Sequence, residues 1–487
     1  MSASHHDPVL IKLQLIEKFR LILVKSKQNE GEATKEAIQF LQELQKNQPL
    51  SSADQFEILM SLAKSTAKKG SDKGGVFIFL KADEFAQHYL TFIESLLKKD
   101  PDRENWANRI YELLGIVDHY NQTSGFKISL YGSDDLLKRY LEILNNLLDR
   151  HISAKQILQL LQVPNIYNVN LFLATPFLKK HEPIERTQLL LTFFLIVYHH
   201  SSNSEISAED LINLCLDKIK MKNTNVDGYN FFQVLNFFGY HTTLMRTLNF
   251  FSSLFLQDKQ KNAENVLDRL ASAHLDFIKQ LMLHDNNVPL DIYFNFIIQL
   301  LHKLSDENMR KKFARKFVDY DIFATYSVEE CREICNPRFQ QGEKQLLVFF
   351  KFLLELRKLL ENNLSMGDNI SSAIIHEKNY RLVLSLLQNN LLDKKFFPRI
   401  DTKEFFKFIS ELPDLSKRGH YLCSALDSQH PIGQVFQNAA EISIIRMMCP
   451  PILTPIYIDR NNAVLFKNHW LVKEEVEMVQ QENRKTL

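Results

Sequence analysis

Two groups of residues in this chain have types and spacing that could do chemistry. Cys331 and Cys335 lie four residues apart and could share one helix face, but no His or further Cys follows at the spacing of a zinc site. Cys423 lies near His420 and His430 in the sequence, as a thiol nucleophile and its base would. Because no further ligand follows Cys331 and Cys335 at that spacing, we expect no metal site. Proximity in sequence does not by itself make Cys423 and a histidine a catalytic pair. An enzyme built on Cys423 and His430 remains one of three hypotheses.

The common enzyme signatures are absent from the sequence. It contains no G-x-x-x-x-G-K-[ST] phosphate loop, no G-x-G-x-x-G turn, no H-E-x-x-H metal motif and no G-x-S-x-G nucleophile elbow. Glycine and proline are scarce, with 13 and 14 residues in 487, which disfavours glycine-rich nucleotide-binding folds and turn-rich all-β folds. The sequence therefore indicates no cofactor.

One arginine lies inside an apolar helical pattern close to the C-terminus. The stretch from Glu441 to Pro455 reads EISIIRMMCPPILTP, with Arg446 at its centre. A guanidinium buried in such a helix needs carboxylates or backbone carbonyls to accept its protons, so we expect Arg446 to reach loop carbonyls or a protein partner. Pro450 and Pro451 cannot continue the helix and fix its end.

This stretch resembles a family signature. Arg446, Pro450 and Pro455 have the spacing of the F-L-R-x-x-x-P-A-[IL]-x-[ST]-P signature of Ras GTPase-activating proteins. Upstream, the segment from Lys344 to Ser372 resembles the helix that delivers the finger loop of that family. The resemblance implies that Arg446 steadies a loop formed by Met366, Gly367, Asp368 and Asn369, with Gly367 where the family has its arginine finger.

The resemblance implies a binding function without strong catalysis. An arginine finger accelerates GTP hydrolysis by about 10³–10⁵, and this chain has glycine at that position. We therefore expect a helical domain over residues 286–472 that binds a small GTPase through Met366, Gly367, Asp368, Asn369, Arg446, Pro450 and Pro455. The second hypothesis is an α-helical protein-interaction scaffold with no GTPase role.

Composition and charge narrow the partners and the compartment. Lys and Arg number 59 against 58 Asp and Glu, a net charge of +1, which argues against a nucleic-acid footprint. The longest strongly apolar run, Leu189–Tyr198, is about half the roughly twenty residues that a bilayer requires, so we expect no membrane span. Five cysteines are too few for a disulfide framework in a chain of this length, so we expect a reducing, cytoplasmic location.

Apolar residues recur at three- and four-residue spacing in segment after segment, which predicts an all-α protein. Ser207 and Asp210 resemble a capping box at a helix start. No period of 20 to 50 residues has matching positions, so we expect a non-repetitive array of helices. We divide the chain into helical regions over 1–165 and 166–285, the domain over 286–472 and a polar tail over 473–487.

The breaks in this pattern give three further expectations. Val76–Leu80 follows a glycine-rich loop and could be a short strand, and the segment from Ser124 to Asp135, with its two glycines, reads as a loop. Ile456–Asp459 and Ala463–Val472 flank an asparagine-rich turn and could form a β-hairpin, with a helix as the alternative.

The C-terminal tail suggests a destination. Glu474, Glu475 and Glu477 resemble the glutamate block on effectors of bacterial type IV secretion systems, and the Lys-, Asn-, Gln- and Phe-rich composition is similar to that of such proteins. This resemblance implies secretion into the cytosol of a host cell. The alternative is a solvated charged tail on a cytoplasmic protein.

Overall fold

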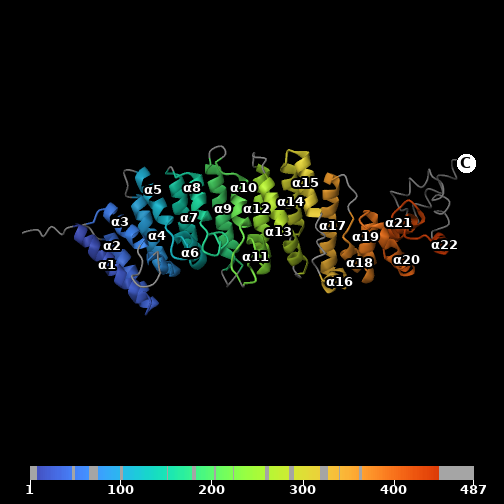
Figure 1. The fold of residues 1–487 in the computed structure, drawn as a ribbon, viewed down its shortest axis with the longest axis horizontal. Helices are drawn as coiled ribbons and strands as arrows, with labels where there is room; N and C mark the ends of the chain where they lie inside the picture. The colour runs from blue at the N-terminus through green and yellow to red at the C-terminus, as the bar shows by residue number, and fades with distance from the viewer. Residues whose placement is uncertain are drawn as a thin grey trace, which may run out of the picture. The chain divides into compact units, whose positions relative to one another are not determined.

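The computed structural model shows a chain of helices (Figure 1). It describes residues 8–46, 50–64, 75–98, 103–150, 152–177, 182–201, 205–222, 224–257, 263–283, 290–318, 327–338, 340–360 and 365–448. Within these ranges all regular elements are α- or 3₁₀-helices, which confirms the all-α prediction. Pro450, Pro455, the predicted hairpin and the acidic tail lie outside the described residues.

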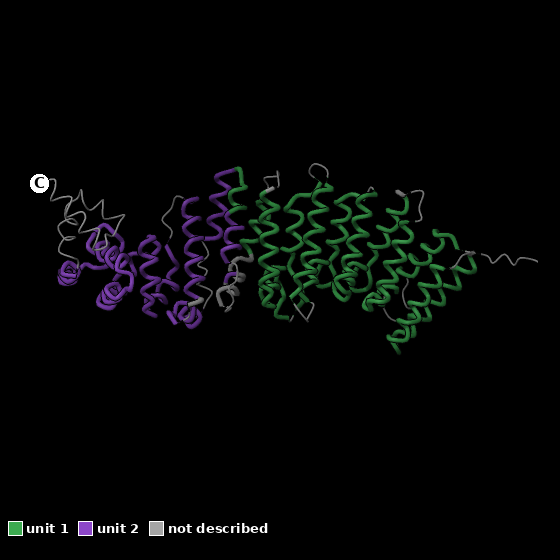
Figure 2. The backbone as a smooth tube through the Cα atoms, turned by 180° about the vertical axis from the view of Figure 1, so that it is seen from behind, with its two compact units in different colours: residues 1–272, 299–305 green, residues 273–298, 306–487 purple. Residues whose placement is uncertain are grey.

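The chain forms two compact units (Figure 2). Unit 1 comprises residues 1–272 and 299–305, and unit 2 comprises residues 273–298 and 306–487. The predicted boundary at residue 165 falls inside unit 1, and the one at residue 285 falls outside the described residues.

Long helices of unit 1 pack in sequence order. After α1 (Pro8–Ser26) they are α2 (Glu30–Lys46), α4 (Asp83–Lys98), α7 (Asp134–Leu148), α9 (Ile184–His200) and α12 (His241–Gln257), and each packs against the next. Their first residues, 30, 83, 134, 184 and 241, are regularly spaced. A recurring order of elements therefore underlies this unit, although the sequence analysis found no repeat.

The long helices α2, α4, α7 and α9 are each followed by a second helix and then by a short element, and α12 is followed by the second helix α13. The second helices are α3 (Ser52–Lys64), α5 (Arg103–Leu114), α8 (Ala154–Gln162), α10 (Ala208–Leu216) and α13 (Glu264–Leu283). The short elements are η1 (Gly75–Lys81), α6 (Ser124–Tyr131), η2 (Thr175–Phe177) and α11 (Phe231–Phe237), and they contact one another in that order. Of these, η1, α6 and α11 pack against α4, α7 and α12 respectively. The predicted capping box at Ser207 and Asp210 is confirmed at the start of α10.

Two of the short elements correct the sequence analysis. Val76–Leu80 is not a strand but part of the 3₁₀-helix η1, in which side chains are buried on more than one face, so no helical or strand period shows in the sequence. The predicted loop at 124–135 is helix α6 followed by the start of α7. Gly125 lies inside α6 because the Tyr140 ring packs onto it: an added Cβ would lie 2.4 Å from the Tyr140 hydroxyl.

The loops that precede the short elements share one backbone conformation. Asp118 N donates to Gln122 O at 3.0 Å, and Asn165 N donates to Val169 O at 2.9 Å. Asn121 (φ 59°) in the first loop matches Asn168 (φ 57°) in the second. Asparagine tolerates this left-handed conformation better than most residues, which accounts for its presence at both positions.

A third loop has the same ends with an insertion between them. Ile219 N donates to Tyr229 O at 3.0 Å, and Gly228, with φ of 79°, takes the place of Asn121 and Asn168. Two residues after these positions, Thr123, Asn170 and Asn230 each cap the following turn through a side-chain oxygen that accepts from a backbone N–H.

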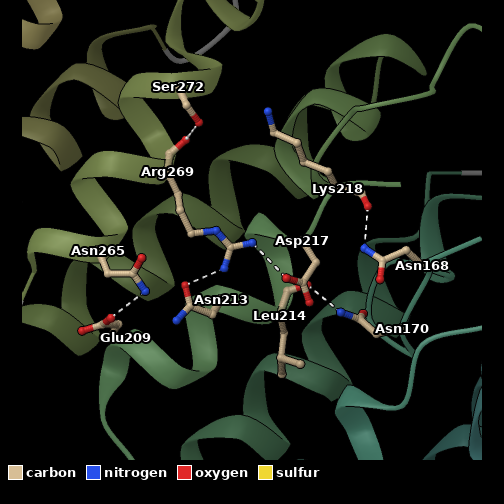
Figure 3. A network of polar contacts seen from close by, with 10 residues as sticks. All are labelled: Asn168, Asn170, Glu209, Asn213, Leu214, Asp217, Lys218, Asn265, Arg269 and Ser272. Atoms are coloured by element: carbon tan, nitrogen blue, oxygen red, sulfur yellow. Dashed lines mark hydrogen bonds and ion pairs between the residues drawn. The ribbon is translucent and has the colours of Figure 1, made fainter. Parts of the chain in front are cut away.

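Each of the three loops is hydrogen-bonded to the next, and we call them the loop ladder (residues 118–122, 165–169, 219–222 and 224–229). Ile166 N donates to Tyr120 O at 3.0 Å, and Lys220 N donates to Tyr167 O at 2.8 Å. Asn121 Nδ2 donates to Pro164 O. Asn168 Nδ2 donates to Lys218 O at 2.6 Å in the same way (Figure 3). Successive periods of unit 1 are therefore joined by main-chain contacts as well as by helix packing.

A network around α10 and α13 continues this order (Figure 3). Asn170 Nδ2 donates to Leu214 O at 2.8 Å. The Arg269 guanidinium donates to Asn213 Oδ1 at 2.8 Å and to Asp217 Oδ1 at 2.9 Å. These bonds tie the second loop and α13 to the same helix, α10.

The elements of unit 2 follow one another along the chain from α14, whose last residues belong to unit 1. They are α14 (Leu290–Lys303), α15 (Glu307–Val318), α16 (Val328–Cys335), α17 (Gln340–Leu360), α18 (Asp368–His376), α19 (Tyr380–Gln388), η4 (Lys394–Arg399), α20 (Thr402–Glu411), α21 (Leu415–Leu426) and α22 (Ala439–Met448). Helix α16 packs against α17 and α18, α18 packs against α19 and η4, and α20, α21 and α22 pack in turn.

Candidate functional site

Arg446 does not have the position that the sequence analysis expected. Helix α22 buries Ile445 against unit 2, and the neighbouring Arg446 side chain is exposed to solvent. The expectation of a buried guanidinium was wrong because only one narrow side of α22 is covered by described residues, and Met447 is 77% exposed. An exposed guanidinium is hydrated and needs no carbonyl partner.

The turn at residues 366–369 is fixed by other residues. Met366 is buried and donates its N–H to Leu391 O at 2.7 Å. Gly367 is the N-cap of α18, and Asp368 lies 2.7 Å from Lys395 Nζ. Asp368 and Asn369 are exposed in the first turn of the helix. The loop that the family resemblance assigns to Arg446 is therefore stabilised by Leu391 and Lys395.

The three cysteines singled out in the sequence are buried, and His430 is hydrogen-bonded to the backbone. Cys331 and Cys335 are both buried in α16, and burial raises the pKa of the Cys335 thiol well above its usual value. Cys423 is also buried, and the Nδ1 atom of His430 accepts the N–H of Ile432 at 3.2 Å. Across the described ranges no three metal-binding side chains gather at one point.

An open groove of unit 1 lies along α7 and α9, beside α12. Its volume is about 560 Å³. We call it the α7–α9 groove, and its lining residues are Asp134, Asp135, Lys138, Leu141, Glu142, Asn145, Glu185, Gln188, Leu189, Thr192, Phe193, Ile196 and Arg246. They recur at three- and four-residue spacing on both helices, so each helix presents one face to the groove.

A buried arginine fixes the relative position of the two helices. Arg186, in the first turn of α9, is 4% exposed. Its guanidinium donates to Asp134 Oδ1 at 2.8 Å, to Gly132 O at 2.6 Å and to Ser129 O. Three acceptors from the α6–α7 turn satisfy this cation, so the charge is paired within the fold. The mouth of the groove is consequently built on a rigid junction.

The groove combines an apolar floor with a mainly acidic rim. Leu141 and Phe193 are buried at its base. Asp134, Asp135, Glu142 and Glu185 line it against two cations, Lys138 and Arg246. Asn145 Oδ1 is buried there and accepts no hydrogen bond from the described part of the chain, so it is an acceptor that a bound molecule could satisfy.

These features suit binding better than catalysis. The lining contains no His, Cys or Ser, and its charged residues lie above apolar side chains. A groove between two helices, with apolar side chains below and charged ones above, matches the shape and polarity of an amphipathic helix. The sequence analysis missed this site because its residues come from three helices that are far apart in the sequence. Each of them, taken alone, has the pattern of an ordinary surface charge or core residue.

Comparisons with known proteins give no family. No family model matches the chain, and no curated protein matches it. Among solved structures it is similar to a circular tandem repeat protein with novel repeat topology and enhanced subunit contact surfaces, at 10% identity over 90% of this chain and 83% of that one. The TM-score of this match is 0.21.

No helix in the described part of the chain is both long and apolar enough to span a bilayer.

Proposed function

We propose that this protein is a helical binding protein that holds a polypeptide partner in the α7–α9 groove. The observation that carries the proposal is the combination of a buried apolar floor and four carboxylates on two helices clamped by Arg186. Such a surface favours a helix with an apolar face and basic flanks. A preformed groove also lowers the ordering cost of binding.

A peptide selection tests the proposal. The full chain is used to select from a displayed library of helical peptides, and affinities of selected peptides are then measured by fluorescence anisotropy. Charge reversal with Glu142→Lys and Glu185→Lys is expected to weaken binding by about tenfold or more, since close charge pairs couple by roughly 1.5 kcal/mol or more. Glu112→Lys, which changes an exposed glutamate on α5 outside the groove, is the matched control. Peptides that are indifferent to both groove substitutions would contradict the proposal.

A narrower candidate is that a small GTPase is the partner. Its support is the signature spacing of Arg446, Pro450 and Pro455, together with exposed Asp368 and Asn369 at the start of α18. A pull-down with a panel of GTP- and GDP-loaded small GTPases tests it. Binding that falls with Asp368→Lys and Asn369→Ala would support it, and no binding to any member would remove it.

A separate proposal concerns the compartment in which the protein acts. If the protein is a bacterial effector, the glutamates of its tail direct it into the host cytosol, and otherwise it acts in the cytoplasm of its own cell. A translocation reporter fused to the full chain decides between these, with Glu474, Glu475 and Glu477 changed to alanine as the comparison. Equal signal from both fusions would oppose the effector reading.

A further inference from the structure

Helices α7 and α9 run parallel, and contacts at both ends set their register. At the N-terminal ends Arg186 donates to Asp134 Oδ1 at 2.8 Å. At the C-terminal ends His200 Nε2 lies 3.3 Å from Asp149 Oδ1. The residues in these pairs are 52 and 51 positions apart in the sequence. Because both helices rise about 1.5 Å per residue, each groove residue of α7 lies level with the residue of α9 that is 51 positions later.

The charged residues of the α7–α9 groove leave one end of it uncharged, and they are Asp134, Asp135, Lys138, Glu142, Glu185 and Arg246. Those on α7 end at Glu142, and Glu185 lies level with Asp134 at the N-terminal end. Helix α12 begins beside α9, since Glu182 Oε1 accepts the N–H of Thr243 at 2.6 Å, so Arg246 lines the same part. Because Asp134 is paired with Arg186, three carboxylates face two cations there, and this part of the groove has an excess of negative charge.

The C-terminal end of the groove is uncharged in its described lining. Its last residues are Asn145 on α7 and Ile196 on α9, which lie level with each other. The Oδ1 atom of Asn145 is buried and accepts no hydrogen bond from the described part of the chain. A donor on a bound molecule removes the cost of this unpaired acceptor. Asn145 is ten residues, or about 15 Å, beyond Asp135 along α7.

The difference between the two ends favours one direction for a bound helix. Basic side chains stabilise a helix in its last turn, where the backbone carbonyls carry partial negative charge, and destabilise it in its first turn. A helix whose basic residues meet Asp135 and Glu185 is therefore more stable with its C-terminus at that end of the groove. Such a helix runs antiparallel to α7 and α9.

We propose, on the basis of the binding function proposed above, that the partner helix lies antiparallel to α7 and α9. A basic residue of its last turn contacts Asp135 and Glu185, and a side-chain donor of its first turn contacts Asn145. The separation of about 15 Å corresponds to ten or eleven residues of the partner. Its contact face then has a donor, apolar residues four and seven positions later, and a basic residue eleven positions later, all on one side of the helix. The apolar residues lie over Leu141 and Phe193.

Two synthetic helical peptides of equal composition test the direction. The first has glutamine in its first turn, leucines four and seven positions later and arginine eleven positions later, and the second has the glutamine and the arginine exchanged. Fluorescence anisotropy with the full chain measures both affinities. The first peptide should bind at least threefold more tightly, because its arginine lies at the stabilising end of the helix. Equal affinities, or tighter binding of the second peptide, would overturn the proposed direction.

Double-mutant cycles with the first peptide locate its two ends. Asn145→Ala should weaken binding about fivefold and should have little effect on a peptide with leucine in place of the glutamine. Glu185→Gln should weaken binding only while the peptide keeps its arginine. Asn146→Ala and Glu112→Gln, which change exposed residues outside the groove, are the matched controls. Circular dichroism checks that each variant folds.

The results separate this inference from the function on which it rests. If Asn145→Ala couples to the arginine instead of the glutamine, the helix lies parallel and the inference is overturned, while binding in the groove stands. If neither peptide binds, the inference is overturned as well, and the displayed library decides independently whether the groove binds helices of another pattern.

Discussion

At the residue scale, a buried ion pair in the first loop of the loop ladder is replaced as a unit further along the chain. Lys127 Nζ lies 2.7 Å from Asp118 Oδ2, and both side chains are at most 3% exposed. The second loop has Asn165 and Ala174 at the matching positions. Where the carboxylate becomes an amide, the lysine is also lost, which is what the cost of burying an unpaired charge requires.

This comparison predicts the effects of matched substitutions. Asp118→Asn keeps the oxygen that accepts from Tyr120 and Gln122 but leaves the Lys127 ammonium without its carboxylate, so it should cost roughly 3–5 kcal/mol of unfolding free energy. Asp118→Asn with Lys127→Ala should cost less than the single change. Chemical denaturation followed by circular dichroism measures both.

Arg446→Ala is the surface control for that series. The buried position expected from the sequence would give a loss of about 1–3 kcal/mol, whereas the exposed side chain predicts a change within about 0.5 kcal/mol. For the ion pair itself, the contradicting result would be that Asp118→Asn with Lys127→Ala is less stable than Asp118→Asn alone.

His420 makes the stability of the folded protein depend on pH. Burial lowers the pKa of its imidazole below the usual 6.5. The unfolded chain therefore binds a proton at a higher pH than the folded chain, and stability falls as the pH drops below about 6.5. The wild type should lose more stability between pH 7 and pH 5 than His420→Gln does, by thermal denaturation. Parallel losses in the two proteins would show that His420 does not contribute.

At the element scale, the loop ladder depends on asparagines with positive φ. Asn168→Ala removes the bond to Lys218 O and places a Cβ-bearing residue without a polar side chain at φ 57°, so it should cost about 1–3 kcal/mol. Asn168→Gly loses the same bond without the backbone strain and should cost less. Hydrogen exchange measured over residues 165–169 and 218–220 should rise more in the alanine variant. Equal exchange in the two variants would argue that φ is not the cause.

Whether the sequence pattern predicts an element correctly depends on how many sides of that element are buried. Helix α7, which has one covered side, shows the three- and four-residue spacing, and the capping box at the start of α10 was predicted as well. The elements η1 and α6 are short and enclosed, so Val76–Leu80 looked like a strand and Ser124–Asp135 like a loop. The period of unit 1 was hidden because its third loop has an insertion and because Tyr229-Asn230 lies two positions out of register with Tyr120-Asn121 and Tyr167-Asn168.

The candidate site could be predicted even less well. The residues around Arg446 are apolar, yet α22 buries only Ile445 among its described residues. The α7–α9 groove needs two helices, with residues 134–145 and 185–196, held at one angle by Arg186. No local pattern contains that angle, because it arises from contacts between residues more than fifty positions apart.

At the scale of the whole molecule, the chain has two compact units rather than one core. Chains of this kind do not unfold in a single two-state step. Calorimetry should therefore show more than one transition, and Asp118→Asn should lower the midpoint of one of them while leaving another in place. A single transition that moves as a whole with Asp118→Asn would mean that the units unfold together.

The loop ladder also bears on how such a protein can change over generations. Neighbouring loops recognise each other through main-chain atoms, as Ile166 N does with Tyr120 O. These contacts do not use the side chains of Tyr120, Ile166 and Tyr167, which are 41% to 53% exposed. Substitution there can alter what the surface attracts while the architecture persists, and the third loop holds additional residues between the same end contacts.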